Sequence, residues 1–189
     1  MERRLIGHVA ALAVLGLLCA GAWSAEQIDN PMYQNWARFK PGTFIIQQTT
    51  TKTEEMNPET RMTYTLKEVT PERVVLEMVM AVVVEGNEMK MPPQTIVHPA
   101  KIDKPEPEGG EVVKPVLLGQ GSEEIAVKGN KIKTTWVKSQ IKQEGETSIV
   151  TIWTSEEIPG SMVKMVTETK GDEPATTTMA LVDFKAERQ

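Results

Sequence analysis

An alternation of apolar and polar residues with a period of two runs through most of the chain after residue 43. In residues 60–67, Met62, Tyr64 and Leu66 alternate with arginine, threonine and lysine, which predicts a half-buried β-strand with those three side chains facing inward. Turn-sized stretches separate this segment from others like it, so consecutive strands are expected to pair as antiparallel neighbours. The other predicted strands are a segment that starts at residue 43 and residues 124–128, 131–142, 148–155, 161–170 and 176–185.

Residues 72–85 differ because they are apolar on both faces. This pattern predicts a central strand that is covered on both sides, or a strand with one face lining an apolar cavity. The next predicted strand, residues 89–98, is interrupted by Pro92 and Pro93, which favours an edge or a bulge. The first face of the apolar strand holds Val74, Leu76, Met78, Met80, Val82 and Val84, and the second holds Val75, Val79, Ala81 and Val83.

Residues 26–39 are the segment with helical character. Asn30 is suited to the N-cap position and Pro31 to the first helical position. Apolar residues then recur at helical spacing and include Trp36 and Phe39. We expect a short helix that folds onto one end of a sheet, with these two aromatic side chains in the core rather than on a binding surface.

Two segments between the predicted strands are predicted to be a loop and a turn. Residues 99–115 are predicted to be a polar surface loop, because residues 101–114 are rich in proline, glycine and charge. Gly129 and Asn130, between two strand patterns, predict a tight hairpin. The expected fold of residues 26–189 is one all-β or β-rich domain: a single, strongly curved antiparallel sheet, an open or half barrel of about eight to ten strands, with a short N-terminal helix.

Two thirteen-residue stretches are alike. KPGTFIIQQTTTK covers residues 40–52 and IPGSMVKMVTETK covers residues 158–170. A duplicated hairpin and simple convergence both explain the likeness, since Pro-Gly corners and threonine-rich strands are common in β proteins. Either way each stretch predicts a Pro-Gly corner that feeds a strand, and we expect the two to occupy equivalent positions in the sheet.

Residues 1–25 have the features of a signal peptide. Arg3 and Arg4 precede an apolar run that ends at Cys19 and is too short for a stable membrane span. Small residues follow, so cleavage is expected between Ala22 and Ala25. A retained anchor and a lipoprotein modified at Cys19 are the alternatives, but the bulky Leu18 disfavours the second. The predicted location is the periplasm or the outside of the cell.

Composition then limits the partners. The formal net charge of the whole chain is −5, and removal of residues 1–25 takes away one Glu and two Arg, which leaves −6. This acidic balance argues against nucleic acid as a partner, because nucleic-acid binding requires a concentrated basic face. No second long apolar run follows, so the mature protein is not expected to span a membrane. Since Cys19 is the only cysteine, the domain has to be held by its core alone.

Residues that could carry catalysis are sparse. His98 is the one histidine after residue 25, no cysteine accompanies it, and no Gly-x-Ser-x-Gly or phosphate-binding glycine motif is present. The adjacent pairs Glu123-Glu124 and Glu156-Glu157 would point to opposite faces of a strand, which is unsuited to acid–base work. We therefore expect no enzymatic activity, no cofactor and no metal site.

Methionine is the compositional exception, with ten of the eleven methionines following the signal peptide. Met78 with Met80, and Met89 with Met91, have the i, i+2 spacing that puts each pair on one face of a strand. They are the candidate ligand-binding residues. Gap-filling in an aromatic-poor core, an apolar-ligand cavity, and a copper(I) site with His98 are the three interpretations. Trp136 and Trp153 are interpreted as core residues, with a sugar-stacking platform as the alternative.

NPMYQNWARFKPGTF, VKGNKIKTTWV and VTIWTSEEIPGSMVKM give the chain a likeness to uncharacterised exported bacterial β-proteins with a Trp-x-Ser-x-x-x-Pro-Gly segment, here Trp153, Ser155, Pro159 and Gly160. The pattern also resembles, more loosely, periplasmic lipoprotein-carrier folds, in which a curved sheet shields an apolar concavity. The resemblance implies a fold and no activity. We expect an exported, non-enzymatic protein that binds an apolar or lipid-like ligand in the sheet concavity; a structural or protein-interaction module of the cell envelope is the alternative.

Overall fold

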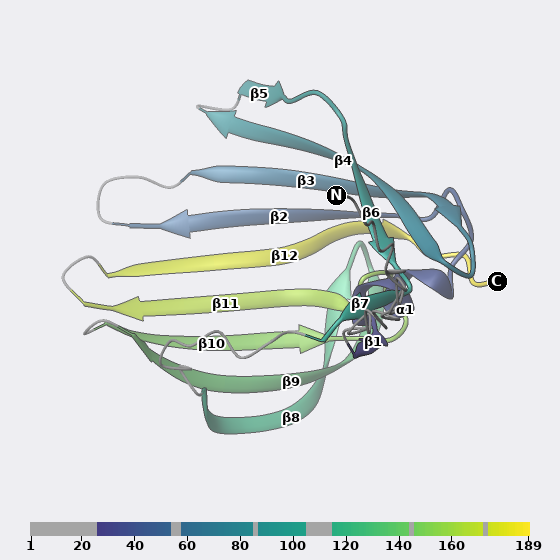
Figure 1. The fold of residues 1–189 in the computed structure, drawn as a ribbon. Coiled ribbons are helices and arrows are strands. Elements are labelled where there is room, and N and C mark those ends of the chain that lie inside the picture. The colour runs from purple at the N-terminus through teal and green to yellow at the C-terminus, as the bar shows by residue number, and fades with distance from the viewer. Residues whose placement is uncertain (1–25, 54–57, 85–86, 105–114, 144–145, 172–173) are drawn as a thin grey trace, which may run out of the picture.

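The computed structural model describes residues 26–53, 58–84, 87–104, 115–143, 146–171 and 174–189. The predicted signal peptide with its cleavage site, and residues 105–114 of the predicted polar loop, lie outside the described residues. Antiparallel strands dominate the described chain, with one short helix, as Figure 1 shows. The predicted β-rich fold class is therefore confirmed.

The main sheet has ten strands in the order β5-β4-β3-β2-β12-β11-β10-β9-β8, with β6 also paired to β4 (Figure 1). All of its pairings are antiparallel, and most join consecutive strands, as the short turns require. The sheet is open, since β8 ends one side of this order and β5 and β6 end the other. The strands are β2 (Phe44–Lys52), β3 (Glu59–Val69), β4 (Arg73–Val84), β5 (Asn87–Lys90), β6 (Gln94–Pro99), β8 (Val116–Val127), β9 (Asn130–Gln143), β10 (Glu146–Thr154), β11 (Met162–Lys170) and β12 (Ala175–Lys185).

A second, two-stranded sheet was not foreseen. β1 (Gln27–Asp29) pairs with β7 (Lys101–Asp103), and ion pairs join Lys101 to Asp29 and Lys104 Nζ to Glu26 Oε2, the latter at 2.8 Å. The prediction of a loop over residues 101–103 is therefore wrong, and the strand at residues 27–29, before the predicted N-cap, was not predicted. Each strand has three residues, which is too short to give a periodic signal, and its partner lies more than seventy residues away in the sequence.

The single helix, α1 (Pro31–Ala37), begins as the sequence predicts. Asn30 is the N-cap: its Oδ1 accepts a hydrogen bond from the Met32 N–H at 3.0 Å, and its Nδ2 donates to the Pro99 carbonyl oxygen at 2.8 Å. Trp36 and Phe39 are buried, so their placement in the core is confirmed. Asn30 thus starts the helix and also ties it to the end of β6.

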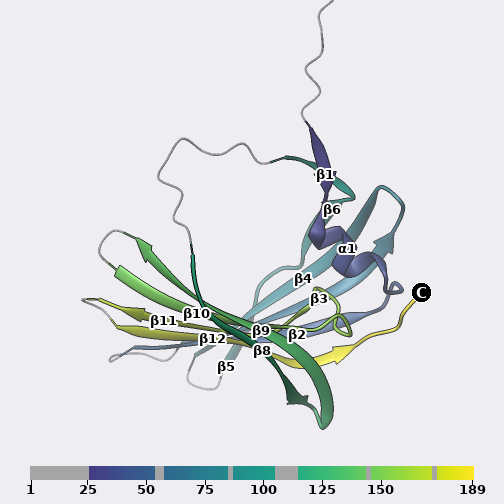
Figure 2. The ribbon, with the colours of Figure 1, turned by 90° about the horizontal axis from the view of Figure 1, so that it is seen from below.

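The core lies at the end of the sheet where α1 sits. Figure 2 shows the sheet bent, with α1 on its inner side. The tip of the β8–β9 hairpin also joins this core, and Lys128 Nζ donates to Asp183 Oδ2 of β12 at 2.5 Å. The core cluster consists of Trp36, Phe39, Ile45, Leu66, Val74, Leu76, Val127, Ile132, Ile158, Val163 and Leu181.

One side of the sheet is interrupted as the prolines predicted. β5 pairs with the last residues of β4 and β6 with the first, and Pro92 and Pro93 lie between the two short strands. β4 is therefore covered only in part: Val74 and Leu76 are buried in the core, whereas Met78 and Met80 are half-buried. Of the two predictions for this apolar strand, full coverage on both sides is wrong.

The β8–β9 hairpin differs from its prediction in two ways. Its tight turn is formed by Lys128 and Gly129, both with positive φ (48° and 84°), rather than by Gly129 and Asn130. β8 also begins at Val116, several residues before the predicted strand. The sequence pattern missed this part because Gly119 and Gly121 interrupt the alternation of apolar and polar residues. In the structure Trp136 of β9 lies directly opposite Gly121.

The two similar Pro-Gly stretches feed β2 and β11, which flank β12 on either side. Both strands run antiparallel to β12, so the two corners lie at the same end of the sheet. Gly42 and Gly160 have positive φ, 89° and 74°, which glycine adopts without steric cost. The likeness between the stretches thus corresponds to one kind of strand entry used on both sides of β12.

Candidate functional site

The face of the main sheet on which α1 lies is called the inner face here, and the opposite face the outer face. Directly opposed residues on neighbouring strands share a face, so the register defines rows of side chains across the sheet. One such row crosses the inner face from β5 to β8 and is mostly apolar. It consists of Met89, Val82, Thr60, Thr49, Met179, Met165, Ile152, Val137 and Gln120.

Methionines are concentrated on this inner face. The four candidates from the sequence lie there: Met80 is opposite Met62, Met78 is opposite Tyr64, Met89 is opposite Val82, and the Met91 N–H donates to the Met80 carbonyl oxygen at 2.7 Å. Sequence reasoning missed three more as ligand-binding residues, although Met62 was placed on the inward side of its strand. The inner-face methionines are Met62, Met78, Met80, Met89, Met91, Met165 and Met179.

None of these seven methionines belongs to the buried core cluster. Met89 and Met91 are 69% and 44% exposed, and the other five are half-buried. Gap-filling of a packed core therefore does not account for them. Methionine side chains are flexible and polarisable, so an exposed group of them forms an adaptable apolar surface.

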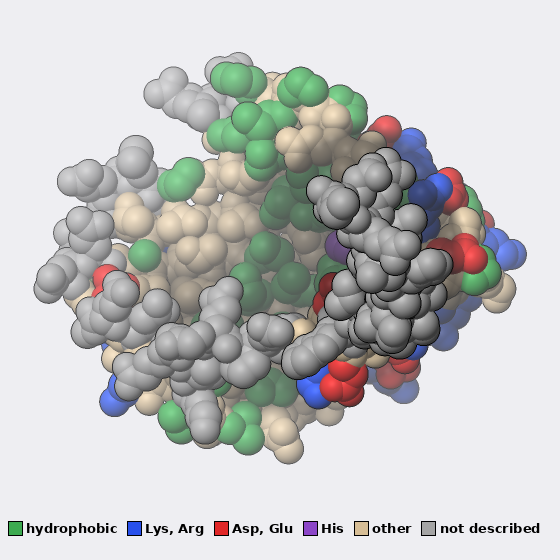
Figure 3. Space-filling view, in the orientation of Figure 1, with side chains coloured by type: hydrophobic (Ala, Val, Ile, Leu, Met, Phe, Trp, Pro, Cys, Tyr) green, Lys and Arg blue, Asp and Glu red, His purple; other side chains and the backbone are tan. Residues whose placement is uncertain are grey.

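The charged residues of the five central strands, β2, β3, β4, β11 and β12, all project from the outer face, whereas Glu146 at the start of β10 shares the inner face with Ser148. Glu77, for example, is opposite Thr65, and Lys164 is opposite Ala180, on the outer face. Figure 3 shows the inner face, with hydrophobic and uncharged polar side chains across its middle and most of the charged ones near α1. The charged residues of β2, β3, β4, β11 and β12 that project outward are Lys52, Glu59, Arg61, Lys67, Glu68, Arg73, Glu77, Lys164, Glu168, Lys170, Asp183 and Lys185.

Two titratable side chains do project from β3 and β6 on the inner face, and burial acts on both. Burial raises the pKa of the Tyr64 phenol and lowers the pKa of the His98 imidazole. Tyr64 Oη also lies 3.4 Å from Met62 Sδ, to which it donates. Both shifts favour the neutral forms of these two side chains, of which Tyr64 lies beside Met62 and Met78 and His98 lies at the α1 end, opposite Val74.

Hydroxyl groups occupy the end of the inner face farthest from α1. Thr51 Oγ1 and Thr177 Oγ1 are 3.1 Å apart, and Ser148 Oγ and Thr169 Oγ1 are 3.2 Å apart, so each pair shares a hydrogen bond. Thr49 Oγ1 is buried from solvent and has no hydrogen-bond partner among the described residues. The inner face is thus apolar at one end and hydroxyl-rich at the other, and Glu146 of β10 lies at the edge of the hydroxyl-rich end.

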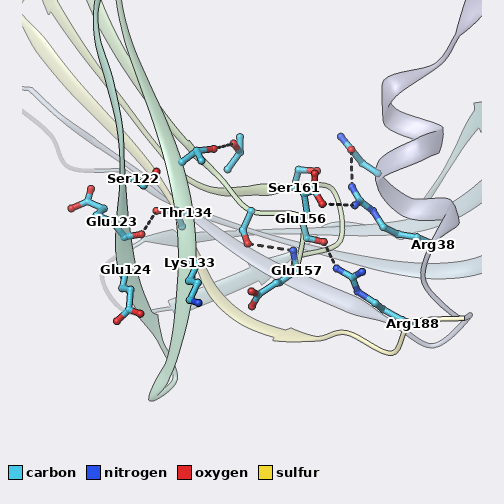
Figure 4. A pocket seen from close by; sticks show the side chains of 14 residues that line it. Arg38, Ser122, Glu123, Glu124, Lys133, Thr134, Glu156, Glu157, Ser161 and Arg188 are labelled. Atoms are coloured by element: carbon cyan, nitrogen blue, oxygen red, sulfur yellow. Dashed lines mark hydrogen bonds and ion pairs between the residues drawn. The ribbon is translucent and has the colours of Figure 1, made fainter.

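A separate polar cleft of about 1020 Å³ lies beside α1 and is shown in Figure 4. Arg38 and Arg188 both reach Glu156: Arg38 Nη1 is 3.8 Å from its Oε2, and Arg188 Nη2 donates to its carbonyl oxygen at 2.9 Å. Glu123 accepts a hydrogen bond from Trp153 Nε1. The cleft thus holds both cations and carboxylates, joined by the Arg38–Glu156 ion pair, and Arg38 Nε is buried without a hydrogen-bond partner among the described residues.

The described residues include no cluster of three or more histidine, cysteine, aspartate or glutamate side chains that could hold a metal ion. His98 of β6 lies opposite Val74 of β4, whereas Met78 is opposite Gln94, and His98 belongs to no such cluster. Trp136 and Trp153 are opposite one another on the outer face, and Trp153 is half-buried against the core. No helix in the described part of the chain has the length and apolar character needed to cross a membrane.

No protein-family model matches the sequence, and no curated protein matches it. Among solved structures, the chain is similar to a protein from Parabacteroides distasonis that is named provisionally as a lipoprotein. The two share 11% identity with a TM-score of 0.47, over 80% of this chain and 98% of that one. The likeness is too distant to assign a family.

Proposed function

We propose that the protein is an exported, non-enzymatic binding protein that holds an apolar or lipid-like ligand on the inner face of its sheet. The observation that carries the proposal is the half-exposed group of methionines on a face from which the central strands exclude charge. A sheet face open to water ordinarily carries polar and charged residues. Here the charges of the central strands lie on the opposite face.

The energetics favour an apolar occupant. Removing apolar surface from water contributes roughly 25 cal/mol per Å², and a contiguous apolar surface that is left open is typical of an interaction site. Met89 and Met91 keep much of their surface accessible, and the half-buried Met62, Met165 and Met179 extend the surface across the sheet. A hydrocarbon chain lying over these methionines would bury the exposed thioethers without bringing a charge into contact with them.

The test is binding of a neutral apolar fluorophore, N-phenyl-1-naphthylamine, together with native mass spectrometry of protein purified from the exporting cell. Met179→Lys places a charge in the middle of the inner row, and Thr178→Lys places the same charge on the outer face of the same strand. We expect fluorophore binding to fall at least about tenfold in the first variant and to be unchanged in the second. Wild-type protein that neither binds the fluorophore nor carries a lipid contradicts the proposal.

A cell-envelope interaction module is the second candidate, and one observation favours it. Val116, Leu117 and Leu118 are exposed at the start of β8, the strand that ends the sheet order. An unpaired edge strand with apolar side chains is a site at which a partner chain can add a strand. Cross-linking in the exporting cell tests this candidate. Leu117→Lys should abolish recovery of a cross-linked envelope protein and leave fluorophore binding intact. Loss of both would contradict a partner site on β8 that is separate from the inner face.

A further inference from the structure

We infer that the ligand on the inner face is an amphiphile whose polar group is uncharged and bears hydroxyls; this inference rests on the proposed function. The hydrocarbon part would lie on the methionines, and the polar group would lie on a hydroxyl field at the end of the sheet remote from α1. The hydroxyl field is defined as Thr49, Thr51, Thr60, Thr167, Thr169, Thr177 and Ser148, all on the inner face.

The inner face changes character in the same direction along β2, β3, β11 and β12, whereas β4 stays apolar as far as Val82. In β12, Leu181 is buried at the α1 end, Met179 lies in the middle and Thr177 lies toward the other end. The inner positions of β11 follow the same order as Val163, Met165, Thr167 and Thr169, and those of β2 follow it as Ile45, Gln47, Thr49 and Thr51. A ligand that matches this surface has an apolar end and a polar end.

The polar end cannot be charged without a large cost. Bringing an ionised group onto a partly desolvated surface is unfavourable unless an opposite charge or several hydrogen bonds compensate it. β2, β3, β4, β11 and β12 offer no carboxylate, ammonium or guanidinium group on this face, and Glu146, which shares the face of Ser148 on β10, would repel an anionic head. A sulfate or carboxylate head would therefore lie there without a counter-charge, and a quaternary ammonium head would find one only at Glu146, beyond Ser148 at the edge of the field.

Hydroxyls on the ligand, in contrast, would find partners. A threonine or serine hydroxyl offers one donor and two acceptor positions, so the pairs Thr51–Thr177 and Ser148–Thr169 each keep unused capacity. Thr49 Oγ1 is buried and has no partner among the described residues, which is a costly state for a polar atom. Thr49 lies in the inner row between Thr60 and Met179, where the apolar and hydroxyl regions meet. Rotation of Thr49 about χ1 would bring this oxygen to the surface, where a ligand hydroxyl would satisfy it.

The experiment compares ligands with one chain length and different heads. Monolaurin, methyl laurate, laurate and dodecylamine are titrated against protein carrying N-phenyl-1-naphthylamine at pH 8, below their aggregation concentrations. We expect monolaurin to displace the fluorophore at a concentration roughly tenfold lower than the other three. Equal displacement by all four, or tighter binding of a charged one, overturns the inference and leaves the proposed function standing.

Threonine-to-valine variants test where the polar head group of the ligand binds. The double variant Thr49→Val and Thr177→Val removes inner-face hydroxyls with little change in shape, and Thr50→Val with Thr178→Val is the matched control on the outer faces of the same two strands. The inner-face pair should remove the monolaurin preference while methyl laurate binding stays unchanged, and the control should alter neither. A preference that survives the inner-face pair places the head elsewhere and overturns the inference. If the fluorophore does not bind wild-type protein at all, the proposed function itself is wrong.

Discussion

Gly121 lies directly opposite Trp136 on the outer face of the β8–β9 hairpin, and the indole ring fills the space that a side chain at Gly121 would need. A Cβ built on Gly121 would stand 2.9 Å from Trp136 Cε2 and Cζ2, which is closer than such atoms approach in proteins. An aromatic ring over a glycine in the facing strand covers backbone that would otherwise be open to water. This contact explains why β8 tolerates glycine in its interior.

We therefore expect Gly121→Ala to lower the free energy of unfolding by about 1–3 kcal/mol, because the Trp136 ring has to move. Urea denaturation followed by tryptophan fluorescence measures the change. Gly119→Ala is the matched control, since a Cβ there would be 3.5 Å from Trp136 Cζ3, an ordinary contact. A larger loss in the control than in Gly121→Ala contradicts this account of the hairpin.

The two Pro-Gly corners give a second prediction. Gly42→Ala and Gly160→Ala each force a side chain into a left-handed backbone conformation, which costs roughly 1–2 kcal/mol. Only at Gly160 would the new Cβ also crowd a neighbour, Trp36 Nε1 at 3.3 Å, and that crowding adds about 1 kcal/mol. Thermal unfolding should rank Gly160→Ala as the less stable variant. An equal loss of stability in the two variants would mean that the Trp36 side chain moves away from the new Cβ at no cost, which contradicts the prediction.

A third prediction concerns the N-cap of α1. Asn30→Ala removes both the acceptor for the Met32 N–H and the donor to the Pro99 carbonyl, at a residue that is 5% exposed. The expected loss of stability is about 2 kcal/mol, the sum of a cap and a buried hydrogen bond. Asn30→Ser keeps a cap acceptor without a charge but loses the donor to Pro99, so its stability should fall between those of wild type and Asn30→Ala. Chemical denaturation distinguishes the three proteins, and a Ser variant no more stable than the Ala variant would show that the cap matters little.

A fourth prediction follows from His98. Burial lowers its pKa in the folded state below the ordinary value of 6.5, so the unfolded chain binds this proton more readily. The contribution of His98 to stability is therefore fully present above pH 6.5 and is lost as the pH falls through 6.5 toward the folded-state pKa. Wild-type protein should lose stability between pH 7.5 and pH 5.5, and His98→Asn should lose less over the same interval. Chemical denaturation at the two pH values measures both losses. An equal loss of unfolding free energy in wild type and His98→Asn would contradict the lowered pKa of His98.

The sequence predicted parts of the candidate site but not the site as a unit. The i, i+2 spacing put Met78 with Met80 on one face, because alternation in a strand is a local property. Nothing local connects that pair with Met179, since β12 lies about a hundred residues further along the chain and reaches β4 only through β2 and β3. The hydroxyl field was visible only as threonine-rich strands, with no indication that those threonines share a face with the methionines.

By itself the sequence determined the fold class, the Asn30 cap and Pro31 start of α1, the interruption at Pro92 and Pro93, and the inward side of residues 60–67. Each of these depends on residues a few positions apart, where backbone sterics and side-chain alternation act directly. The tertiary structure decided the pairing of β1 with β7, the fit of Trp136 over Gly121, and the exclusion of charge from one face of the central strands. Those features depend on strand register across long sequence separations, because a shift of one residue in any pairing would turn every side chain of that strand to the other face.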